Sequence, residues 1–493
     1  MDPHRTSLNP NKHLKEQFVS NLTGSSMLEI AALLTTVPIL VLLRQSISSF
    51  HVNDARDTPS EKKDYPVVAP RNFSAYFTAL TLDFLCIVLP MLLFFTVLAE
   101  WTYVWTSLLA FLLIFCVASK RSISSSSPSI EGGLRPFNTS ISSYRVAVML
   151  VTCLCILAVD FRIFPRKYAK TETYGTSLMD LGVGSFVLAN AIVSRQARNV
   201  SSMNWKMAIK STSPLLVLGF GRLVSTASVD YQVHVGEYGV HWNFFFTLAG
   251  VSILSSIINV SPKYSGLLGS VILFGYQSWL MNGLNVYLLS NERGMDVISR
   301  NKEGIFSIFG YWGMYLLGVQ VGYSLFFGNR SAIKRSKKGI TTRVWLLSIF
   351  FWSLTLFLER HFERVSRRMC NLAYVTWVLA QNLQLLAILL LSDYVPGSKM
   401  LILEKAFDQN LLVSFLLANV LTGLVNLSVD TLFASPLSAL SILIVYAFTL
   451  TVFIGIINFY GIRFKFWSSQ AQCIMCVILD YCQEHILHCM SFN

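Results

Sequence analysis

The sequence predicts an all-α polytopic membrane protein with about thirteen transmembrane helices, and two observations carry that prediction. Of the 493 residues, 53% are hydrophobic and only 13% are charged, which is too apolar for a soluble protein of this size. Apolar runs of about 18 residues or more, the length that a helix needs to cross the hydrocarbon core, recur from near Met27 to Tyr460. The runs are continuous rather than alternating, so we expect helices and not a β-barrel.

Each predicted helix is an apolar run that ends at a charged, glycine-rich or otherwise polar loop. In chain order they lie near residues 27–48, 74–98, 101–118, 146–161, 176–194, 214–228, 241–260, 265–289, 305–327, 344–358, 370–392, 410–428 and 436–460. An odd number of crossings places the two termini on opposite sides. Short basic loops stay in the cytosol, and the most basic loop is Arg330 to Arg343. We therefore expect a luminal N-terminus and a cytosolic C-terminus.

The chain divides into three predicted regions. Residues 1–26 are polar and contain no cleavable signal peptide, so the first apolar run acts as an anchor. Residues 27–460 form the transmembrane domain, and residues 461–493 form a cysteine-rich tail. The cysteine and histidine spacing of the tail fits no common zinc finger, so we predict no metal site and favour a membrane-apposed or palmitoylated tail. The formal charge of +13 lies in short loops rather than in one basic domain, so no nucleic-acid partner is expected.

The stretch from Asp160 to Asp180, DFRIFPRKYAKTETYGTSLMD, leaves one apolar run and enters the next, so its charges lie at a membrane boundary. Ionisable groups there require a functional or a pairing explanation. Pro165 breaks any continuous helix, which lets Asp160 and Lys170 fold back toward one another as a pair. Asp160 can act as a general base on a substrate hydroxyl, and Lys170 can bind phosphate or stabilise an oxyanion. The alternative is an interfacial ion pair without chemistry.

Other polar residues near predicted helix ends are weaker candidates. Asp180 either orients Lys170 or is a buried acid capped by hydroxyls. Glu237 and His241 are four residues apart, so we expect them on one helical face, where His241 and Asn243 can hydrogen-bond a sugar or inositol hydroxyl. Glu303 at a helix start can simply complement the helix dipole. Arg222 inside a predicted span needs a partner, for which Asp83 is one possible acid; we interpret that pair as structural.

Basic residues concentrate in the predicted cytosolic loops, but three segments on the predicted luminal side are also charged: Arg162 to Lys170, Asn291 to Glu303, and Glu359 to Arg368. A phosphate or a CoA on that side would explain the positive charge. Anchoring of the spans by basic residues at lipid headgroups is the alternative.

Four separated segments together resemble the glucosaminyl-phosphatidylinositol inositol acyltransferase family of glycosylphosphatidylinositol (GPI) anchor synthesis. They are ILAVDFRIFPRKYAKTETYGTSLMDLGVG, EYGVHWNFF, NKEGIFSIFGY and RRMCNLAYVTWV, and the similarity covers roughly residues 15–460. The resemblance implies an endoplasmic reticulum enzyme of about thirteen spans that transfers palmitoyl from palmitoyl-CoA to the inositol 2-hydroxyl of glucosaminyl-phosphatidylinositol. Arg162 stands where the family usually carries proline.

The resemblance also implies the site. The key aspartate and lysine of the family fall on Asp160 and Lys170, which become the expected catalytic residues of a luminal active site around residues 160–180. Arg166, Lys167 and Arg162 are then expected to hold phosphate or CoA. The candidates proposed above from the residues themselves complete the predicted substrate-binding set: Asp180, Glu237, His241, Asn243 and Glu303. No cofactor is expected beyond the acyl-CoA substrate, and the oligomeric state is open. The rival interpretation is a lipid or solute transporter that uses the buried charges for conduction.

Overall fold

The computed structural model describes residues 14, 17–48, 72–124, 137–200, 205–228, 235–328, 337–395 and 399–463. Within these ranges, every extended regular element is a helix, and strand-like pairing is confined to isolated bridges of Gly24 and Ser25 with Thr176. The predicted class, an all-α polytopic membrane protein, is confirmed. Residues 464–493, which contain the cysteines and histidines of the tail, lie outside the described part of the chain.

Nine segments in the described ranges are helical, long and apolar enough to cross a membrane. They are α2 (Met27–Ser48), α4 and α5 (Phe73–Asp83 and Leu89–Phe95, joined by a π-helical turn), α6 (Thr102–Ser124), α7 (Phe137–Ala158), α15 (Lys302–Gly322), α16 (Lys337–His361), α17 (Leu372–Leu390), α19 (Leu411–Ser428) and α20 (Pro436–Phe459). The other described α-helices are α8 (Leu181–Ile192), α9 (Trp205–Ser228), α10 (Val235–Tyr238), α11 (Phe244–Ile258), α12 (Ser265–Trp279), α13 (Asn285–Leu289), α14 (Val297–Arg300) and α18 (Ile402–Gln409).

All thirteen predicted segments fall on helices. In the described part of the chain, nine of them are both long and apolar enough to cross a membrane, so the count of thirteen crossings stays a prediction. The remaining four correspond to α8, α9, α11 and the kinked pair α12–α13. The sequence did not predict α18, whose eight residues alternate apolar and charged side chains too closely for a membrane span.

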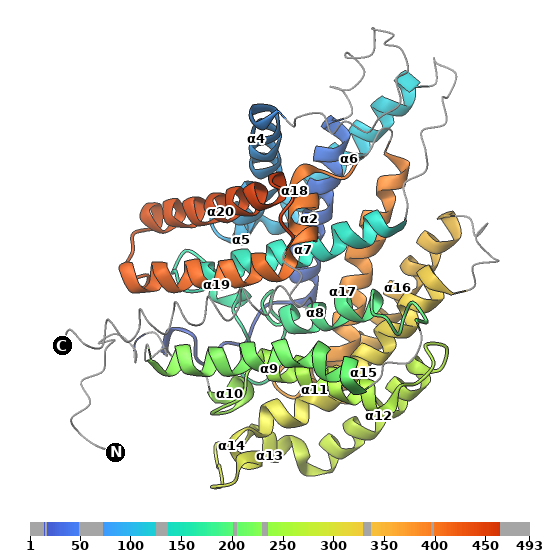
Figure 1. The fold of residues 1–493 in the computed structure, drawn as a ribbon, viewed down its shortest axis with the longest axis vertical. Helices are drawn as coiled ribbons and strands as arrows, with labels where there is room; N and C mark the ends of the chain where they lie inside the picture. The colour runs from blue at the N-terminus through green and yellow to red at the C-terminus, as the bar shows by residue number, and fades with distance from the viewer. Residues whose placement is uncertain are drawn as a thin grey trace.

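Helix α17 forms the centre of the molecule, between α2, α7, α8, α15 and α16 (Figure 1). In its most apolar window, 94% of the residues are buried. The polar side chains of α17 need protein partners, and its position supplies them: Tyr144 OH of α7 donates to Asn382 Oδ1 at 3.0 Å. Its N-terminus is capped by Asn371, whose side chain accepts a hydrogen bond from Tyr374 N at 3.0 Å. The turn before α17 is therefore fixed to the core of the protein.

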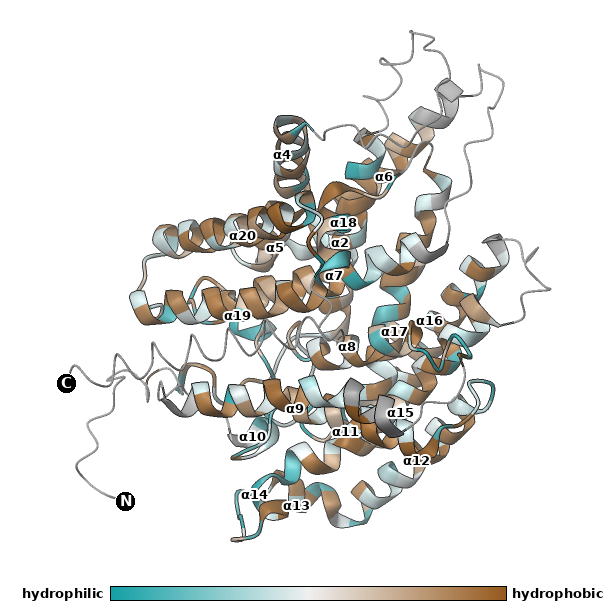
Figure 2. Ribbon diagram, in the orientation of Figure 1, coloured by the Kyte–Doolittle hydropathy of each residue, from teal (hydrophilic) through white to brown (hydrophobic). Residues whose placement is uncertain are grey.

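The outer helices expose apolar surface. In the most apolar 18-residue stretch of α6, only 6% of the residues are buried. Phe111, Ile114 and Phe115 of this helix all lie on the surface. Helices α19 and α20 are also largely apolar and appear mostly brown in Figure 2. Apolar surface this extensive indicates contact with lipid hydrocarbon rather than water.

Loops that are distant in sequence converge at one end of the helices. Ser25 N donates to Thr176 O at 2.7 Å, and Gly175 N donates to Val365 O at 2.9 Å. Val240 N donates to Arg300 O at 3.1 Å, which adds two further loops. The three charged segments of the predicted luminal side are thereby brought to one region of the molecule.

A second polar network lies away from these loops and joins α2, α4 and α18. Arg44 Nε lies 2.9 Å from Asp83 Oδ1, Leu403 N donates to Asp83 Oδ2 at 3.2 Å, and Gln45 Nε2 donates to Glu404 Oε2 at 3.0 Å. The suggested partnership of Asp83 with Arg222 is wrong, because Asp83 pairs with Arg44. This network fixes α18 against the longer helices.

Candidate active site

The loop between α7 and α8 is shaped by one of its own side chains. Arg166 Nη2 donates to the carbonyls of Val159 (2.9 Å), Phe161 (3.1 Å) and Phe164 (2.8 Å). Its guanidinium also lies over the ring of Phe18, 3.9 Å from the centroid. Carbonyls that leave a helix end need donors, and here one guanidinium supplies them. Burial lowers the pKa of Arg166 to about 10, against an upward pull from Asp160, so the side chain stays charged at neutral pH.

Asp160 lies in the first turn of this loop and is half-buried. Its Oδ2 accepts a hydrogen bond from Asn426 Nδ2 on α19 at 2.7 Å. Arg162 is exposed, and its guanidinium lies 5.7 Å from the ring centroid of Phe433. The carboxylate is thus held between the α7–α8 loop and the last turns of α19.

Lys170 ends a chain of alternating charges that we call the ionic chain: Lys170, Glu237, Arg367 and Asp180. Lys170 Nζ lies 2.7 Å from Glu237 Oε1, and Arg367 Nη1 lies 3.3 Å from the same oxygen. Arg367 Nε in turn lies 2.9 Å from Asp180 Oδ1. The predicted pairing of Lys170 with Asp160 is therefore wrong, because a loop distant in sequence supplies the carboxylate.

Asp180 is buried and has two kinds of partner. It is capped by backbone and hydroxyl, since its carboxylate accepts from Thr171 N at 3.1 Å and from Thr171 Oγ1 at 2.8 Å. It is also linked to Lys170 through Arg367 and Glu237. Its own carbonyl accepts from Tyr374 OH of α17 at 2.7 Å. The ionic chain is therefore anchored on the central helix.

Access to solvent increases along the ionic chain. The side chains of Asp180 and Arg367 are 0% and 5% exposed, that of Glu237 is 17% exposed, and that of Lys170 is 39% exposed. Burial alone raises the pKa of Glu237, but Lys170 and Arg367 outweigh it and lower this pKa to about 2. Glu237 thus stays ionised at neutral pH and holds the ammonium at the accessible end.

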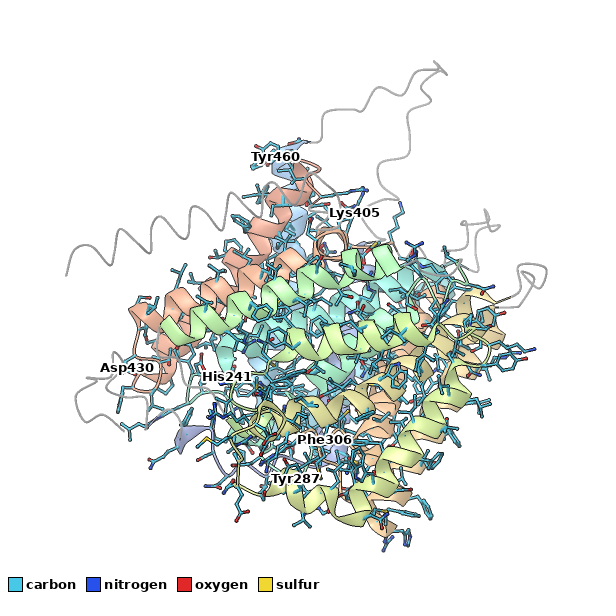
Figure 3. All side chains as sticks on the ribbon, turned by 60° about the horizontal axis from the view of Figure 1, so that its bottom comes forward. His241, Tyr287, Phe306, Lys405, Asp430 and Tyr460 are labelled. Atoms are coloured by element: carbon cyan, nitrogen blue, oxygen red, sulfur yellow. The ribbon has the colours of Figure 1, made fainter. Side chains whose placement is uncertain are left out.

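Glu303 belongs to a separate ion cluster. Its side chain is fully buried, with Oε1 lying 2.7 Å from Arg293 Nη2 and 2.9 Å from Arg368 Nη2. Beside it, buried Lys302 donates to the carbonyls of Tyr287 (2.7 Å), Ser290 (2.9 Å) and Glu292 (2.9 Å). The rings of Tyr287 and Phe306 lie together at the bottom of Figure 3, with centroids 6.4 Å apart. This cluster ties α13 to the start of α15, which explains Glu303 without a substrate.

Lys167 points to the N-terminal end of α2. Its Nζ lies 2.8 Å from Glu29 Oε1 and 3.3 Å from Glu100 Oε1. Tyr168 OH donates to the same Glu29 oxygen at 2.9 Å. Burial lowers the pKa of Lys167, but the two carboxylates outweigh it and raise this pKa.

The segment after α10 differs from the expectation of one continuous helical face. Helix α10 ends at Tyr238, and Gly239 has φ +110°, a conformation that non-glycine residues rarely adopt. The predicted shared face of Glu237 and His241 is therefore wrong, because the chain turns between them. His241 is exposed, and its backbone N–H donates to Asn301 Oδ1 at 2.7 Å.

Asn243 caps α11 rather than facing open space. Its Oδ1 accepts from Phe245 N at 3.0 Å, and its Nδ2 donates to Gly219 O at 2.9 Å. The side chain is buried, and a capping asparagine explains why the apolar helix begins here.

Sequence reasoning missed three residues of this region. Arg367 was part of a charged luminal segment and of a family motif, but nothing marked it as the partner of Glu237. The carboxylate of Glu363 accepts hydrogen bonds from the Tyr174 hydroxyl (3.0 Å) and from the Gln277 side-chain amide (2.8 Å). It thereby joins the α7–α8 loop to α12. Asn426 is a polar residue in an apolar helix, which is a weak signal because α19 contains several.

Comparison with known proteins gives the family. The GWT1 family model matches residues 11–457. A protein of Arabidopsis thaliana whose name states no activity is 61% identical over 435 residues, which are 87% of this chain and 98% of that protein. The GPI-anchored wall transfer protein 1 of Aspergillus oryzae is 38% identical over 504 residues, covering 89% of this chain and 96% of its own.

A mouse relative carries the most specific name. The glucosaminyl-phosphatidylinositol-acyltransferase PIGW of Mus musculus is 33% identical over 529 residues, which cover 92% of this chain and 99% of that protein. The family match spans Asp160, Asn426 and the whole ionic chain. This chain, with its helical membrane domain and its convergent charged loops, belongs to the GWT1 family.

Proposed function

We propose that this protein is an O-acyltransferase of GPI-anchor biosynthesis. It moves a palmitoyl group from palmitoyl-CoA to the inositol 2-hydroxyl of glucosaminyl-phosphatidylinositol. Membership of the GWT1 family supports acyl transfer, and the name of the mouse relative supports this lipid as the acceptor. The acyl donor and the acylated hydroxyl are what the resemblance to the inositol acyltransferase family implies.

The single observation that carries the site assignment is that side-chain exposure increases along the ionic chain, from buried Asp180 to accessible Lys170. An ammonium has three donors, and Glu237 takes one of those of Lys170. Because 39% of the Lys170 side chain is exposed, the remaining donors can reach an anionic group of a bound substrate. Glu237 and the two buried members behind it, Arg367 and Asp180, fix the ammonium in place.

Asp160 is the proposed general base. Its carboxylate removes the proton of the inositol hydroxyl while the hydroxyl oxygen attacks the thioester carbonyl carbon. The new ester bond forms, the carbon–sulfur bond breaks, and the CoA thiolate leaves and takes up the proton that Asp160 removed, which restores the carboxylate. Lys170 stabilises the developing oxyanion or a substrate phosphate. No covalent acyl-enzyme is needed for this route.

The remaining candidate residues are assigned to positioning. The donors of Arg166 hold the carbonyls of the loop, Lys167 pairs with Glu29, and Asn243 caps α11. Asp180 and Glu237 hold the ionic chain, and Glu303 fixes a neighbouring loop. Exposed His241 and Arg162 are the residues of this group with surface available for a sugar or a phosphate.

We place the enzyme in the endoplasmic reticulum membrane with the N-terminus in the lumen and the C-terminus in the cytosol. The distribution of basic loops supports this orientation. In sealed microsomes a tag on the N-terminus should be protected from added protease, and a tag on the C-terminus should be digested. The opposite pattern would overturn the orientation.

The direct test is acyl transfer by the purified protein in lipid. It uses labelled palmitoyl-CoA, glucosaminyl-phosphatidylinositol and the variants Asp160→Asn, Lys170→Met and Glu292→Gln. We expect a loss of about a hundredfold or more in the first two, the scale of a removed base or oxyanion donor. Glu292→Gln is the matched control, because it removes an exposed carboxylate of a neighbouring loop and should retain wild-type rates.

Two outcomes would contradict the proposal. Folded Asp160→Asn and Lys170→Met proteins with wild-type rates would show that the residue roles are wrong. An active preparation of the wild type that forms no acylated lipid, yet moves lipid or solute across a vesicle membrane, would favour the transporter.

A further inference from the structure

Asn426 makes an unusual contact for an asparagine in an apolar helix. It lies in the last turn of α19, and its Nδ2 donates across the molecule to Asp160 Oδ2 at 2.7 Å. Its own Oδ1 accepts from Thr431 Oγ1 at 3.4 Å, which fixes the amide so that the NH₂ group faces the carboxylate. The contact joins two segments 266 residues apart.

A second asparagine on the same helix shows what such a residue does without a partner of this kind. Asn419 Nδ2 donates to Phe415 O, four residues earlier in α19, at 2.8 Å. That local bond satisfies the amide within its own helix. Asn426 has the same option in principle, but its amide is directed at Asp160 instead.

We propose that Asn426 is a positioning residue for the general base, holding the Asp160 carboxylate in its reactive rotamer. This inference rests on the proposed function, since it assigns a role relative to the base. The amide transfers no proton itself. A donor to a carboxylate favours the ionised form, so Asn426 keeps Asp160 ready to accept a proton from the substrate hydroxyl.

Other groups also act on Asp160 and must be considered in any pH experiment. Arg166 on the same loop interacts with it electrostatically and favours the charged carboxylate. Tyr446 of α20 also lies within electrostatic range of Asp160, and its hydroxyl donates to Cys153 O at 2.7 Å. Neither contact depends on Asn426, so both persist in the variants below.

The test is the pH dependence of kcat for acyl transfer by the full-length protein in lipid. In Asn426→Leu we expect kcat to fall about tenfold or more while KM changes less than about twofold, because the base loses its orientation. At low pH kcat falls as the base becomes protonated, and we call this fall the acidic limb of the profile. In the variant the acidic limb should shift to higher pH by about one unit, because the carboxylate loses a hydrogen-bond donor. A purely structural role would lower kcat without moving that limb.

A second variant guards against misfolding, and a third is the control. Asn426→Asp keeps the side-chain shape but places two carboxylates together, so the acidic limb should move up by at least as much. Asn419→Leu removes a comparable amide of α19 that does not contact Asp160, and should keep the wild-type profile. A wild-type acidic limb in both Asn426 variants, or an equal shift in Asn419→Leu, would overturn the inference.

The failure of this inference can be told from failure of the proposed function. If Asp160→Asn retains activity, Asp160 is not the base and this inference fails with that assignment, whereas the proposed acyltransferase function fails only if the wild type forms no acylated lipid. If Asp160→Asn is inactive and both Asn426 variants keep the wild-type pH profile, only the role of Asn426 is wrong.

Discussion

At the scale of single residues, the ionic chain explains how four charges can lie beside the membrane helices of this protein. Isolated buried charges are very costly, because water no longer solvates them. Here Glu237 lies between Lys170 and Arg367, and Arg367 lies between Glu237 and Asp180. Each buried charge therefore has an opposite charge within hydrogen-bonding distance. The alternation gives every charge of the ionic chain an opposite charge as its neighbour.

The depressed pKa of Glu237 gives a prediction for stability. A carboxylate with a pKa of about 2 in the folded state and an ordinary value of 4.5 stabilises the fold above pH 4.5. That contribution, about 3 kcal/mol at most, is lost as the pH falls toward 2. We expect the thermal unfolding temperature of the wild type in detergent to drop between pH 5 and pH 3. Glu237→Gln should be less stable at pH 7 and lose part of this pH dependence.

The control for that measurement is Glu292→Gln, whose carboxylate is exposed. It should follow the wild-type curve of unfolding temperature against pH. An unchanged pH dependence in Glu237→Gln would mean that the ionised Glu237 does not stabilise the fold.

Sequence reasoning at this scale reached the residues but not their partners. Asp160 and Lys170 stood out because charges at a membrane boundary are rare. Their pairing could not be predicted, since the true partner of Lys170 comes from a loop more than 60 residues away. Asn426 could not be distinguished from Asn419, because only the fold decides which amide meets a carboxylate.

At the scale of elements, the apolar runs were sufficient to locate the long helices. Hydrocarbon demands continuous apolar sequence and internal hydrogen bonds, so the pattern leaves little choice. Two elements did not follow from it. Helix α18 is short and amphipathic, and it is held by Asp83 and Gln45. Helix α10 ends after one turn because Gly239 follows it with a φ of +110°, and a Cβ at this position would lie 2.5 Å from Asn301 Cα.

The packing of α15 against the turn that carries Arg367 depends on Gly310. A Cβ at this position would lie 2.1 Å from the backbone oxygen of Cys370, which cannot move as a flexible side chain can. Cys370 has φ +50°, so this turn is already in a demanding conformation. We expect Gly310→Ala to destabilise the protein by about 1–3 kcal/mol and to lower acyl transfer, because the ionic chain shifts.

The matched control is Gly275→Ala in α12, where an added Cβ meets nothing within 4 Å. Thermal unfolding in detergent should show a lower transition for Gly310→Ala and an unchanged or higher one for Gly275→Ala. Equal effects of the two substitutions would show that the contact with Cys370 is unimportant.

At the scale of the whole molecule, the arrangement of loops creates the site. Backbone hydrogen bonds join the segments around residues 25, 175 and 365, and those around 240 and 300, and the ion pairs of Glu237 connect the two groups. In Figure 3, His241 of one of these loops lies in the middle of the view, apart from Lys405 and Tyr460 in its upper part. The sequence indicated charged loops on one side of the membrane, but their mutual contacts depend on how the helices around α17 are ordered. No local pattern contains that order.

The central claim is that Asp160 and Lys170 act in one chemical step although they do not pair with each other. The most direct test is a double-mutant cycle on kcat/KM for acyl transfer with Asp160→Asn, Lys170→Met and the combined variant. Residues that serve one transition state have strongly non-additive effects. We predict that the double variant is about as slow as the slower single variant. A double variant whose loss equals the product of the two single losses would contradict the claim.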